Sequence, residues 1–146
     1  MFNFYYKQLI LILILLFHKI LFINNYHEII PNLYLGNAWS SFLNYENFDV
    51  IVNVTNDIDF PEKYKKLKIR IPVDDNYIFK NQEIIKYLYI LDDLKKYYNT
   101  NKKILIHCRF GVQRSAFITQ LLLKKILNIN DDKCIKLIKN KRKICF

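Results

Sequence analysis

A short apolar run, a polar loop and a long apolar run follow one another between residues 104 and 127, and this order constrains the fold more than any other feature. Ile104–Ile106 has the length and composition of a short buried β-strand. Arg114–Leu127 is largely apolar and long enough to form a buried helix. A strand that leads through a loop into a buried helix is the repeating unit of α/β sheets.

Strand and helix patterns also alternate along the rest of the chain. Val50–Val54 is continuously apolar and β-branched apart from one Asn, which is typical of a strand covered on both faces. Pro31 comes shortly before Leu33–Leu35, so we expect that segment to be an edge strand, where proline is tolerated. The sequence further predicts a strand at Leu67–Val73, a helix at Gln82–Tyr98 capped by Asn81, and a last helix capped by Asn130 with Cys134, Leu137 and Ile138 inward. This order predicts a three-layer α/β sandwich with a central, mostly parallel sheet of about five strands flanked by helices.

The length and composition fit one globular domain, which we place at residues 28–146. With 146 residues, 52% of them hydrophobic, the chain can bury a core of ordinary size. Its three cysteines are too few, and odd in number, for a disulfide framework, so we expect a reducing compartment and a cytoplasmic catalytic domain. Cys134 and Cys145 have no partner at zinc-ligand spacing, and we interpret them as small core residues.

The chain is strongly basic, with a formal net charge of +10. Phosphorylated substrates, nucleic acid and anionic membranes all suit such a charge, so it excludes none of these classes by itself. A chain-wide enrichment in Lys, Asn, Ile and Tyr explains the charge equally well. The basic run Lys139–Lys143 suggests a membrane-anchored nucleic-acid binder, but such a run is more often a solvated helix end, and we do not expect a nucleic-acid partner.

Residues 1–25 form a hydrophobic N-terminal segment. Leu9–Phe17 is strongly apolar, and residues 9–23 approach the thickness of a bilayer if His18 and Lys19 are tolerated there. The sequence after it lacks an Ala-x-Ala-like cleavage site, so a membrane anchor fits better than a cleaved signal peptide. Three alternatives remain: membrane association through residues 9–23, an appendage that packs on the domain, and a segment foreign to the domain.

The loop between the strand at 104–106 and the helix at 114–127 carries groups suited to a phosphate. Ligands of α/β sheets bind outside the carboxyl ends of the strands, where this loop lies. Backbone N–H groups at a helix N-terminus bind anions, and Gly111 permits backbone conformations that a Cβ would resist. Arg114 can hold two phosphate oxygens at once. The same N–H groups and the helix dipole favour a thiolate at Cys108, which would make it a nucleophile at neutral pH.

Two neighbours complete this nucleophilic site. Ser115 can donate a hydrogen bond to the sulfur when it departs as a thiolate. We expect His107 to order the loop rather than to act as a base, because a pre-formed thiolate needs none. The candidate phosphate-binding residues are those of the loop itself and the arginine that ends it: Arg109, Phe110, Gly111, Val112, Gln113 and Arg114.

The pattern His-Cys-x5-Arg-Ser, read here as His107, Cys108, Arg114 and Ser115 with Gly111 inside, resembles the signature loop of the cysteine-based protein tyrosine phosphatase superfamily. The segments IIPNLYLGN, FDVIVNVTND, IRIPVDDNY and KKILIHCRFGVQRS follow one another in the order and spacing of the dual-specificity protein phosphatase domain. This resemblance extends over about residues 28–140.

The resemblance assigns two further roles. An aspartate in the loop before the long helix protonates the leaving hydroxyl, and the matching position is Asp75, with Asp74 the neighbour most easily confused with it. Positioned acid catalysis typically contributes about a hundred- to ten-thousand-fold. Asn53 matches a residue that braces the phosphate loop. We expect neither a metal nor a cofactor, because Arg114 and the loop N–H groups stabilise the equatorial oxygens of the phosphate.

The function implied by the resemblance is a protein phosphatase that hydrolyses phosphotyrosine and phosphoserine or phosphothreonine through a phosphocysteine intermediate. Its partner would be a phosphorylated protein, and the oligomeric state is open. One alternative is the same mechanism on RNA 5′ phosphates or phosphoinositides, although only Arg109 is basic among the variable loop positions. The other is a truncated, non-catalytic phosphate-binding pseudoenzyme.

Two departures from the family pattern bear on this interpretation. Gln113 stands where many members have Ser or Gly, so we expect it to crowd the mouth of the loop or to contact the substrate. Family members usually continue through a proline turn into another core helix, whereas this sequence ends at KNKRKICF. We therefore treat 28–146 as a catalytic domain shortened at its C-terminus, with its core either exposed there or covered by the N-terminal segment.

Overall fold

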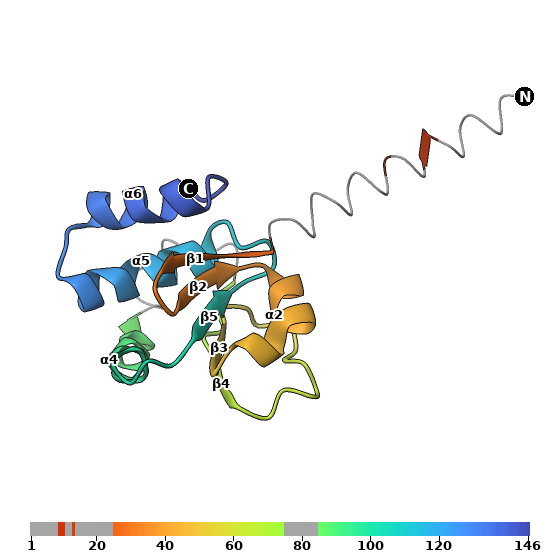
Figure 1. The fold of residues 1–146 in the computed structure, drawn as a ribbon, viewed down its shortest axis with the longest axis horizontal. Coiled ribbons are helices and arrows are strands. Elements are labelled where there is room, and N and C mark those ends of the chain that lie inside the picture. Colours follow the sequence, from red (N-terminus) through yellow and green to blue (C-terminus); the bar gives the residue numbers. More distant parts are fainter. Residues whose placement is uncertain (1–8, 11–12, 14–24, 75–84) are drawn as a thin grey trace, which may run out of the picture.

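The structure of the protein is a computed structural model that describes residues 9–10, 13, 25–74 and 85–146. Its centre is a five-stranded sheet with the order β1-β2-β5-β3-β4 (Figure 1). β2, β5, β3 and β4 run parallel to one another, and β1 is antiparallel to β2. The strands are β1 Tyr26–Ile30, β2 Leu33–Gly36, β3 Val50–Asn53, β4 Leu67–Arg70 and β5 Ile104–His107. This mostly parallel sheet confirms the predicted α/β class.

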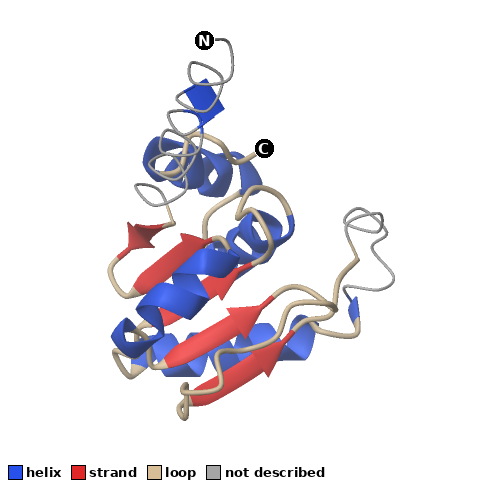
Figure 2. Ribbon diagram, turned by 90° about the vertical axis from the view of Figure 1, so that its right-hand side faces the viewer, coloured by secondary structure: helices blue, strands red, loops and turns tan. Residues whose placement is uncertain are grey.

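Helices lie on both faces of the sheet, as Figure 2 shows. α4, α5 and α6 pack on one side, and the short α2 with the 3-10 turn η1 lies on the other. Their bounds are α2 Ala38–Asn44, η1 Tyr45–Asn47, α4 Leu88–Asn99, α5 Arg114–Leu127 and α6 Asp131–Lys141. The three layers predicted from the alternation of strands and helices are therefore present.

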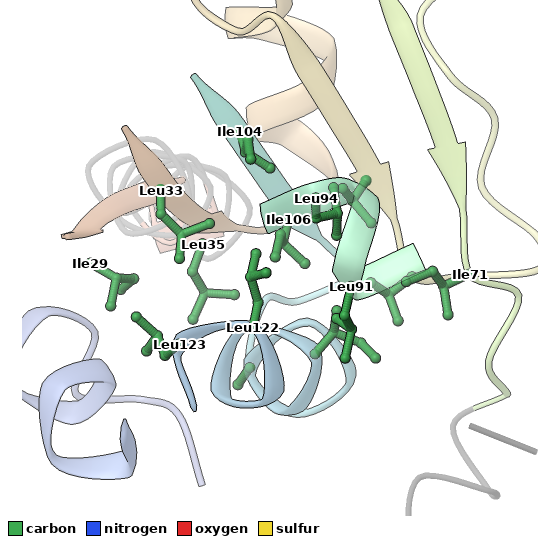
Figure 3. Close-up of a cluster of buried hydrophobic side chains, with 14 of the residues drawn as sticks. Ile29, Leu33, Leu35, Ile71, Leu91, Leu94, Ile104, Ile106, Leu122 and Leu123 are labelled. Atoms are coloured by element: carbon green, nitrogen blue, oxygen red, sulfur yellow. The ribbon is translucent and has the colours of Figure 1, made fainter. Parts of the chain in front are cut away.

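The larger hydrophobic cluster lies between the sheet and α4, α5 and α6. Side chains that alternate along β2 and β5 point toward Leu122 of α5 and Leu94 of α4 (Figure 3). Leu33, Leu35, Ile104, Ile106 and Leu122 are each fully buried. Removing this apolar surface from water is the main force that holds α5 against the sheet.

A smaller aromatic cluster covers the other face of the sheet. Its buried members are Phe48, Ile51, Tyr64 and Leu105. The ring of Phe48 makes an edge-to-face contact with Tyr26, their centroids being 5.2 Å apart. Because neighbouring side chains on β3 and β5 enter different clusters, both strands are buried on both faces, as the continuous apolar run of β3 predicts.

The helix at residues 114–127 has the predicted bounds, and its end has a clear physical cause. Asn128 adopts a left-handed conformation with φ 52°, which terminates α5. Asn130 then caps α6 by accepting a hydrogen bond from the backbone N of Lys133 at 3.0 Å, as predicted. Cys134 and Ile138 face the core, while Leu137 is half-buried.

The prediction that Leu33–Leu35 is an edge strand is wrong. β2 pairs with β1 on one side and with β5 on the other, and β1 is the edge. Pro31 and Asn32 form the turn between β1 and β2, with Asn32 at φ 66°, so the proline lies outside the strand ladder and sets no limit on β2. The sequence patterns also missed β1 and α2.

Two predicted elements differ from the observed ones in their bounds. β4 ends at Arg70, so the strand predicted over Leu67–Val73 is shorter. α4 begins at Leu88 and buries Leu91 and Leu94, whereas Ile85 is 60% exposed. The predicted cap Asn81 lies outside the described residues.

The predicted membrane segment lies almost entirely outside the described residues. Within it only Leu9, Ile10 and Leu13 are described, and all three side chains are exposed. In the described part of the chain, none of the helices has both the length and the apolar character needed to cross a membrane. The anchor and the division of the chain at residues 25–28 stay predictions.

Candidate phosphate-binding active site

The loop between β5 and α5 lies at the carboxyl end of the parallel strands, as the sequence predicts. His107 ends β5 and is in register with Gly36 of β2 on one side and with Asn53 of β3 on the other. The loop that follows, residues 108–113, therefore starts from the centre of the sheet. The loop therefore lies between the end of β2, which carries Gly36, and the end of β3, which carries Asn53.

Cys108 receives hydrogen bonds from two donors. The backbone N–H of Gly111 donates to its Sγ at 3.3 Å, and the Ser115 hydroxyl donates at 3.2 Å. Cys108 is 3% exposed and Ser115 is fully buried, so both bonds are sheltered from water. Donors aimed at a sulfur stabilise negative charge on it. The structure thus brings Ser115 to the atom that the sequence analysis assigns to it.

Arg114, the first residue of α5, lies beside the cysteine. It is 4% exposed, and its Nη1 donates to the carbonyl oxygen of Val73 at 3.0 Å. A pocket of about 280 Å³ is lined by both residues together with Phe110, Val112 and Gln113. Gln113 is exposed at this pocket, in accord with its expected place at the mouth of the loop. A guanidinium beside the sulfur can hold the oxygens of a phosphate that the sulfur attacks.

Gly111 has a conformation and a position that exclude other residues. Its φ is +67°, and a Cβ built on it would lie 2.4 Å from the carbonyl oxygen of Gly36. Gly36 ends β2, and these two are the only glycines in the sequence. The phosphate loop therefore rests on the sheet with backbone against backbone.

Arg142, a residue that the sequence analysis did not single out, donates hydrogen bonds to the backbone of the phosphate loop. It is 1% exposed, and its Nε donates to the carbonyl oxygen of Gly111 at 2.7 Å while Nη2 donates to that of Phe110 at 3.2 Å. The thiol of Cys145 also donates to the Gly111 oxygen at 3.4 Å, and burial raises the pKa of this thiol to about 11. With its carbonyl bound on this side, Gly111 is held with its N–H on Cys108.

His27 of β1 completes this support. Its Nδ1 lies 3.0 Å from Nη1 of Arg142. Partial burial lowers the pKa of His27, and the Arg142 charge lowers it further. A neutral imidazole with a free lone pair on Nδ1 accepts a hydrogen bond from the guanidinium. No local pattern in the sequence indicates this contact, because Arg142 stands within a run of lysines typical of a solvated helix end.

His107 is fully buried between the neighbouring strands. Burial lowers its pKa to about 4, the positive charge of Arg70 acts in the same direction, and a hydrogen bond with the Cys108 carbonyl opposes them. Nδ1 lies 3.4 Å from that carbonyl oxygen, and Nε2 has no hydrogen-bond partner within the described ranges. An imidazole with so low a pKa is a weak base, which agrees with the expectation that His107 orders the loop.

Asn53 braces the loop that follows β3. Its Nδ2 donates to the carbonyl oxygen of Ile58 at 2.7 Å, and its Oδ1 accepts from Thr55 Oγ1 at 2.7 Å. Asp57 on this loop forms an ion pair with Arg109 of the phosphate loop. Asn53 is therefore linked to the phosphate loop through a neighbouring loop, and its predicted bracing role stays a prediction.

The candidate acid Asp75 lies outside the described residues. Its neighbour Asp74 is the last residue described before that gap and is half-buried. Val73, which precedes Asp74, accepts a hydrogen bond from Arg114 as given above, so the described chain before Asp74 is held at the site. The assignment of Asp75, like the expectation of catalysis without metal or cofactor, stays a prediction.

Comparison with known proteins places the chain in a family. The family model for the catalytic domain of dual specificity phosphatases matches residues 33–146. The chain therefore belongs to the dual specificity phosphatase catalytic-domain family, a cysteine-based class of phosphatase. The resemblance read from the signature loop is confirmed.

Two relatives are similar to most of this chain. Human dual specificity protein phosphatase 16 is 29% identical over 122 residues, which cover 79% of this chain and 18% of that protein. A Slingshot homolog, a protein phosphatase of Xenopus laevis, is 29% identical over 123 residues, covering 80% of this chain and 17% of that protein. The chain thus spans about a fifth of the length of these relatives.

A solved structure shares the fold. The crystal structure of human DUSP28 superimposes with a TM-score of 0.74 and 17% sequence identity, covering 84% of each chain. At this identity the likeness establishes the arrangement of strands and helices.

Proposed function

We propose that this domain hydrolyses phosphate monoesters of tyrosine and of serine or threonine in proteins through a phosphocysteine intermediate. The observation that carries the proposal is the pair of hydrogen bonds donated by Gly111 N and Ser115 Oγ to the Sγ of Cys108, a residue that lines one pocket with Arg114. This set supplies a nucleophile, a phosphate-binding guanidinium and a group that stabilises the departing sulfur.

In the first step, the Cys108 thiolate attacks phosphorus. A sulfur–phosphorus bond forms as the bond to the substrate oxygen breaks, and Asp75 gives its proton to that oxygen. Arg114 and the N–H groups of the loop hold the three non-bridging oxygens as charge develops on them. The products are a phosphocysteine, a free hydroxyl on the protein substrate and an ionised Asp75.

In the second step, water attacks the phosphorus of the intermediate. Asp75 now accepts a proton from this water, and the sulfur–phosphorus bond breaks to release inorganic phosphate. The electron pair returns to Cys108, where the hydrogen bond from Ser115 stabilises the thiolate. The cycle ends with the acid protonated and the nucleophile ionised, ready for the next substrate.

The choice of a phosphoprotein substrate is supported by the relatives, which are named as protein phosphatases. RNA 5′ phosphates and phosphoinositides present the same monoester to the same loop, and they form the second class of candidate substrate. The pocket lined by both the nucleophile and the arginine supports an enzyme over the pseudoenzyme alternative, which the end of the sequence at KNKRKICF suggested.

Metal-free turnover of a small aryl phosphate in the presence of a chelator tests the chemistry. We expect Cys108→Ser to lower kcat by about ten-thousand-fold or more, because the oxygen at this position is a poor nucleophile. Asp75→Ala should cost about a hundred- to ten-thousand-fold, with Asp74→Ala as its matched control. A folded wild-type protein without turnover would exclude the enzyme, and a larger loss in Asp74→Ala than in Asp75→Ala would move the acid by one residue.

We propose a cytoplasmic location for the catalytic domain, with residues 9–23 as the segment available for membrane association. A sparse, odd set of three cysteines, all buried and free, supports a reducing compartment. Deleting residues 1–24 should release the protein from a membrane fraction into the soluble fraction. Unchanged fractionation would remove the anchor from the proposal.

A further inference from the structure

A second hollow lies directly beside the candidate catalytic pocket. Phe110 and Val112 line both, so the two hollows adjoin the same stretch of the phosphate loop. The second hollow measures about 720 Å³ and is lined by the start of α2, the phosphate loop and the C-terminal residues. The second hollow is therefore within reach of a substrate that is held by its phosphate in the first.

The lining of this second hollow is apolar and exposed. Trp39 is 50% exposed, Phe42 40%, Phe110 66% and Ile144 57%. These side chains come from three segments that are distant in the sequence and converge on one hollow. Large apolar side chains gathered at an open hollow favour the burial of an apolar group of a ligand.

A third hollow continues from the second and differs in charge. The two share Phe42 and Ile58, and the third measures about 670 Å³. Asp57, Asp59 and Glu62 line it, with Lys63 beside them. Asp57 is paired with Arg109, which leaves Asp59, Glu62 and Lys63, so this end keeps an excess of acidic side chains in a chain whose formal net charge is +10.

We propose that the second and third hollows together form a flanking groove that binds the polypeptide next to the phosphorylated residue of the substrate. A large apolar side chain close to the phosphorylated residue occupies the second hollow, and a basic side chain further along lies against Asp59 and Glu62. This inference rests on the proposed function and names the kind of phosphopeptide that the site selects.

The charge of the groove favours a peptide over a phospholipid. Acyl chains would also suit the apolar hollow, but an anionic head group and bilayer surface would then face Asp59 and Glu62. Like charges oppose such an approach, whereas a basic side chain is attracted to the same two carboxylates.

The apolar part is tested with two phosphotyrosine peptide series in which Leu, Phe or Ala flanks the phosphotyrosine on its N-terminal or C-terminal side. We expect Trp39→Ala and Phe42→Ala to lower kcat/KM for the Leu and Phe peptides of at least one series by about tenfold. Turnover of the Ala peptides and of a small aryl phosphate should stay within about twofold of wild type, which also shows that the variants fold.

Leu43→Ala is the matched control for these variants. Leu43 follows Phe42 on α2 and is 48% exposed, but the linings of the three hollows do not include it. The control should leave kcat/KM for every peptide within about twofold of wild type. A loss in Leu43→Ala equal to that in Phe42→Ala would overturn the apolar subsite.

The acidic end is tested by reversing charge. Peptides with Lys or Glu two to four positions from the phosphotyrosine are compared on wild type and on Asp59→Lys, with Asp132→Lys on α6 as the control. We expect wild type to prefer the Lys peptide by about threefold at low salt and Asp59→Lys to reverse this preference. An unchanged preference in Asp59→Lys would overturn the predicted polarity of the groove.

The outcomes separate this inference from the function on which it rests. A wild type that hydrolyses neither aryl phosphate nor peptide overturns the proposed function and the inference with it. Turnover with equal kcat/KM for Leu, Phe and Ala peptides overturns the inference alone. Losses in Phe42→Ala that are confined to vesicles containing a phosphoinositide assign the groove to acyl chains and overturn its assignment to a peptide.

Discussion

The two ends of α5 differ in character. At its N-terminal end, polar side chains are buried: Arg114 is 4% exposed, and Ser115 and Thr119 are fully buried, each with a hydrogen-bond partner inside the protein. At its C-terminal end, Lys124 and Lys125 lie at the surface and form ion pairs with carboxylates of neighbouring helices. One helix thus carries a chemical site at one end and a solvated surface at the other.

This difference shows at which end of α5 the identity of each polar residue matters. A buried polar group costs free energy unless its hydrogen bonds are satisfied, so the buried polar residues at the N-terminal end of α5 each depend on a particular partner. The exposed ion pairs at the other end contribute little, because water and salt screen them. We expect substitutions at the two ends to separate activity from stability.

The largest expected effect comes from Arg114→Lys. Lysine keeps the charge but lacks the planar fork, so kcat/KM for an aryl phosphate should fall by about a hundred- to a thousand-fold. Lys125→Met at the other end of α5 removes the ion pair with Asp92 and should leave the kinetics unchanged. Steady-state kinetics measure both, and similar losses in the two variants would contradict the division.

Arg142→Met tests whether the buried end depends on support from outside the helix. The carbonyl oxygen of Phe110 would lose the guanidinium that binds it, and that of Gly111 would keep only the weak thiol donor Cys145, which should lower the free energy of unfolding by about 4 kcal/mol and also lower kcat. Urea unfolding and aryl phosphate kinetics measure these changes. Lys141→Met, an exposed neighbour, is the control, and a stable, fully active Arg142→Met protein would show that the loop holds itself.

The smallest effect concerns pH and His107. Its pKa is lowered to about 4 in the folded protein from 6.5, so between these values the unfolded chain binds more protons than the folded one. Stability is therefore complete above pH 6.5 and falls as the pH drops, by about 3 kcal/mol at pH 4. Urea unfolding from pH 7 to pH 5 measures the slope before the carboxylates titrate.

The control for this slope is a variant of the same site. His107→Gln should remove most of the pH dependence, while His27→Gln should remove a smaller part, because the pKa of His27 is lowered in the same direction. A slope that persists unchanged in His107→Gln would show that other groups cause it.

The sequence predicts best those features that depend on neighbours along the chain. The continuous apolar run of β3, the bounds of α5 and the Asn130 cap each follow from local patterns, and all three are present. The loop residues Cys108 and Ser115 could be placed together because a strand and a helix N-terminus fix both ends of the loop between them.

The features that the sequence missed depend on contacts between distant segments. β1 becomes an edge strand only because the turn at Pro31 and Asn32 folds it back on β2. Arg142 looks like a solvated residue until α6 carries it to the phosphate loop. The flanking groove needs Trp39 and Ile144 to meet, which no pattern along the chain can indicate.

The packing of Gly111 on Gly36 has a mechanical consequence for the site. The backbone of Gly36, the last residue of β2, is packed directly against Gly111. The end of this strand therefore limits how closely the phosphate loop can approach the core. Even a single methyl group at position 36 would meet the Ser40 hydroxyl and the Asn25 carbonyl at less than 3 Å and would displace the backbone of Gly36. Residue 36, which lies outside the signature loop, therefore helps to set the position of Cys108 Sγ relative to a bound phosphate.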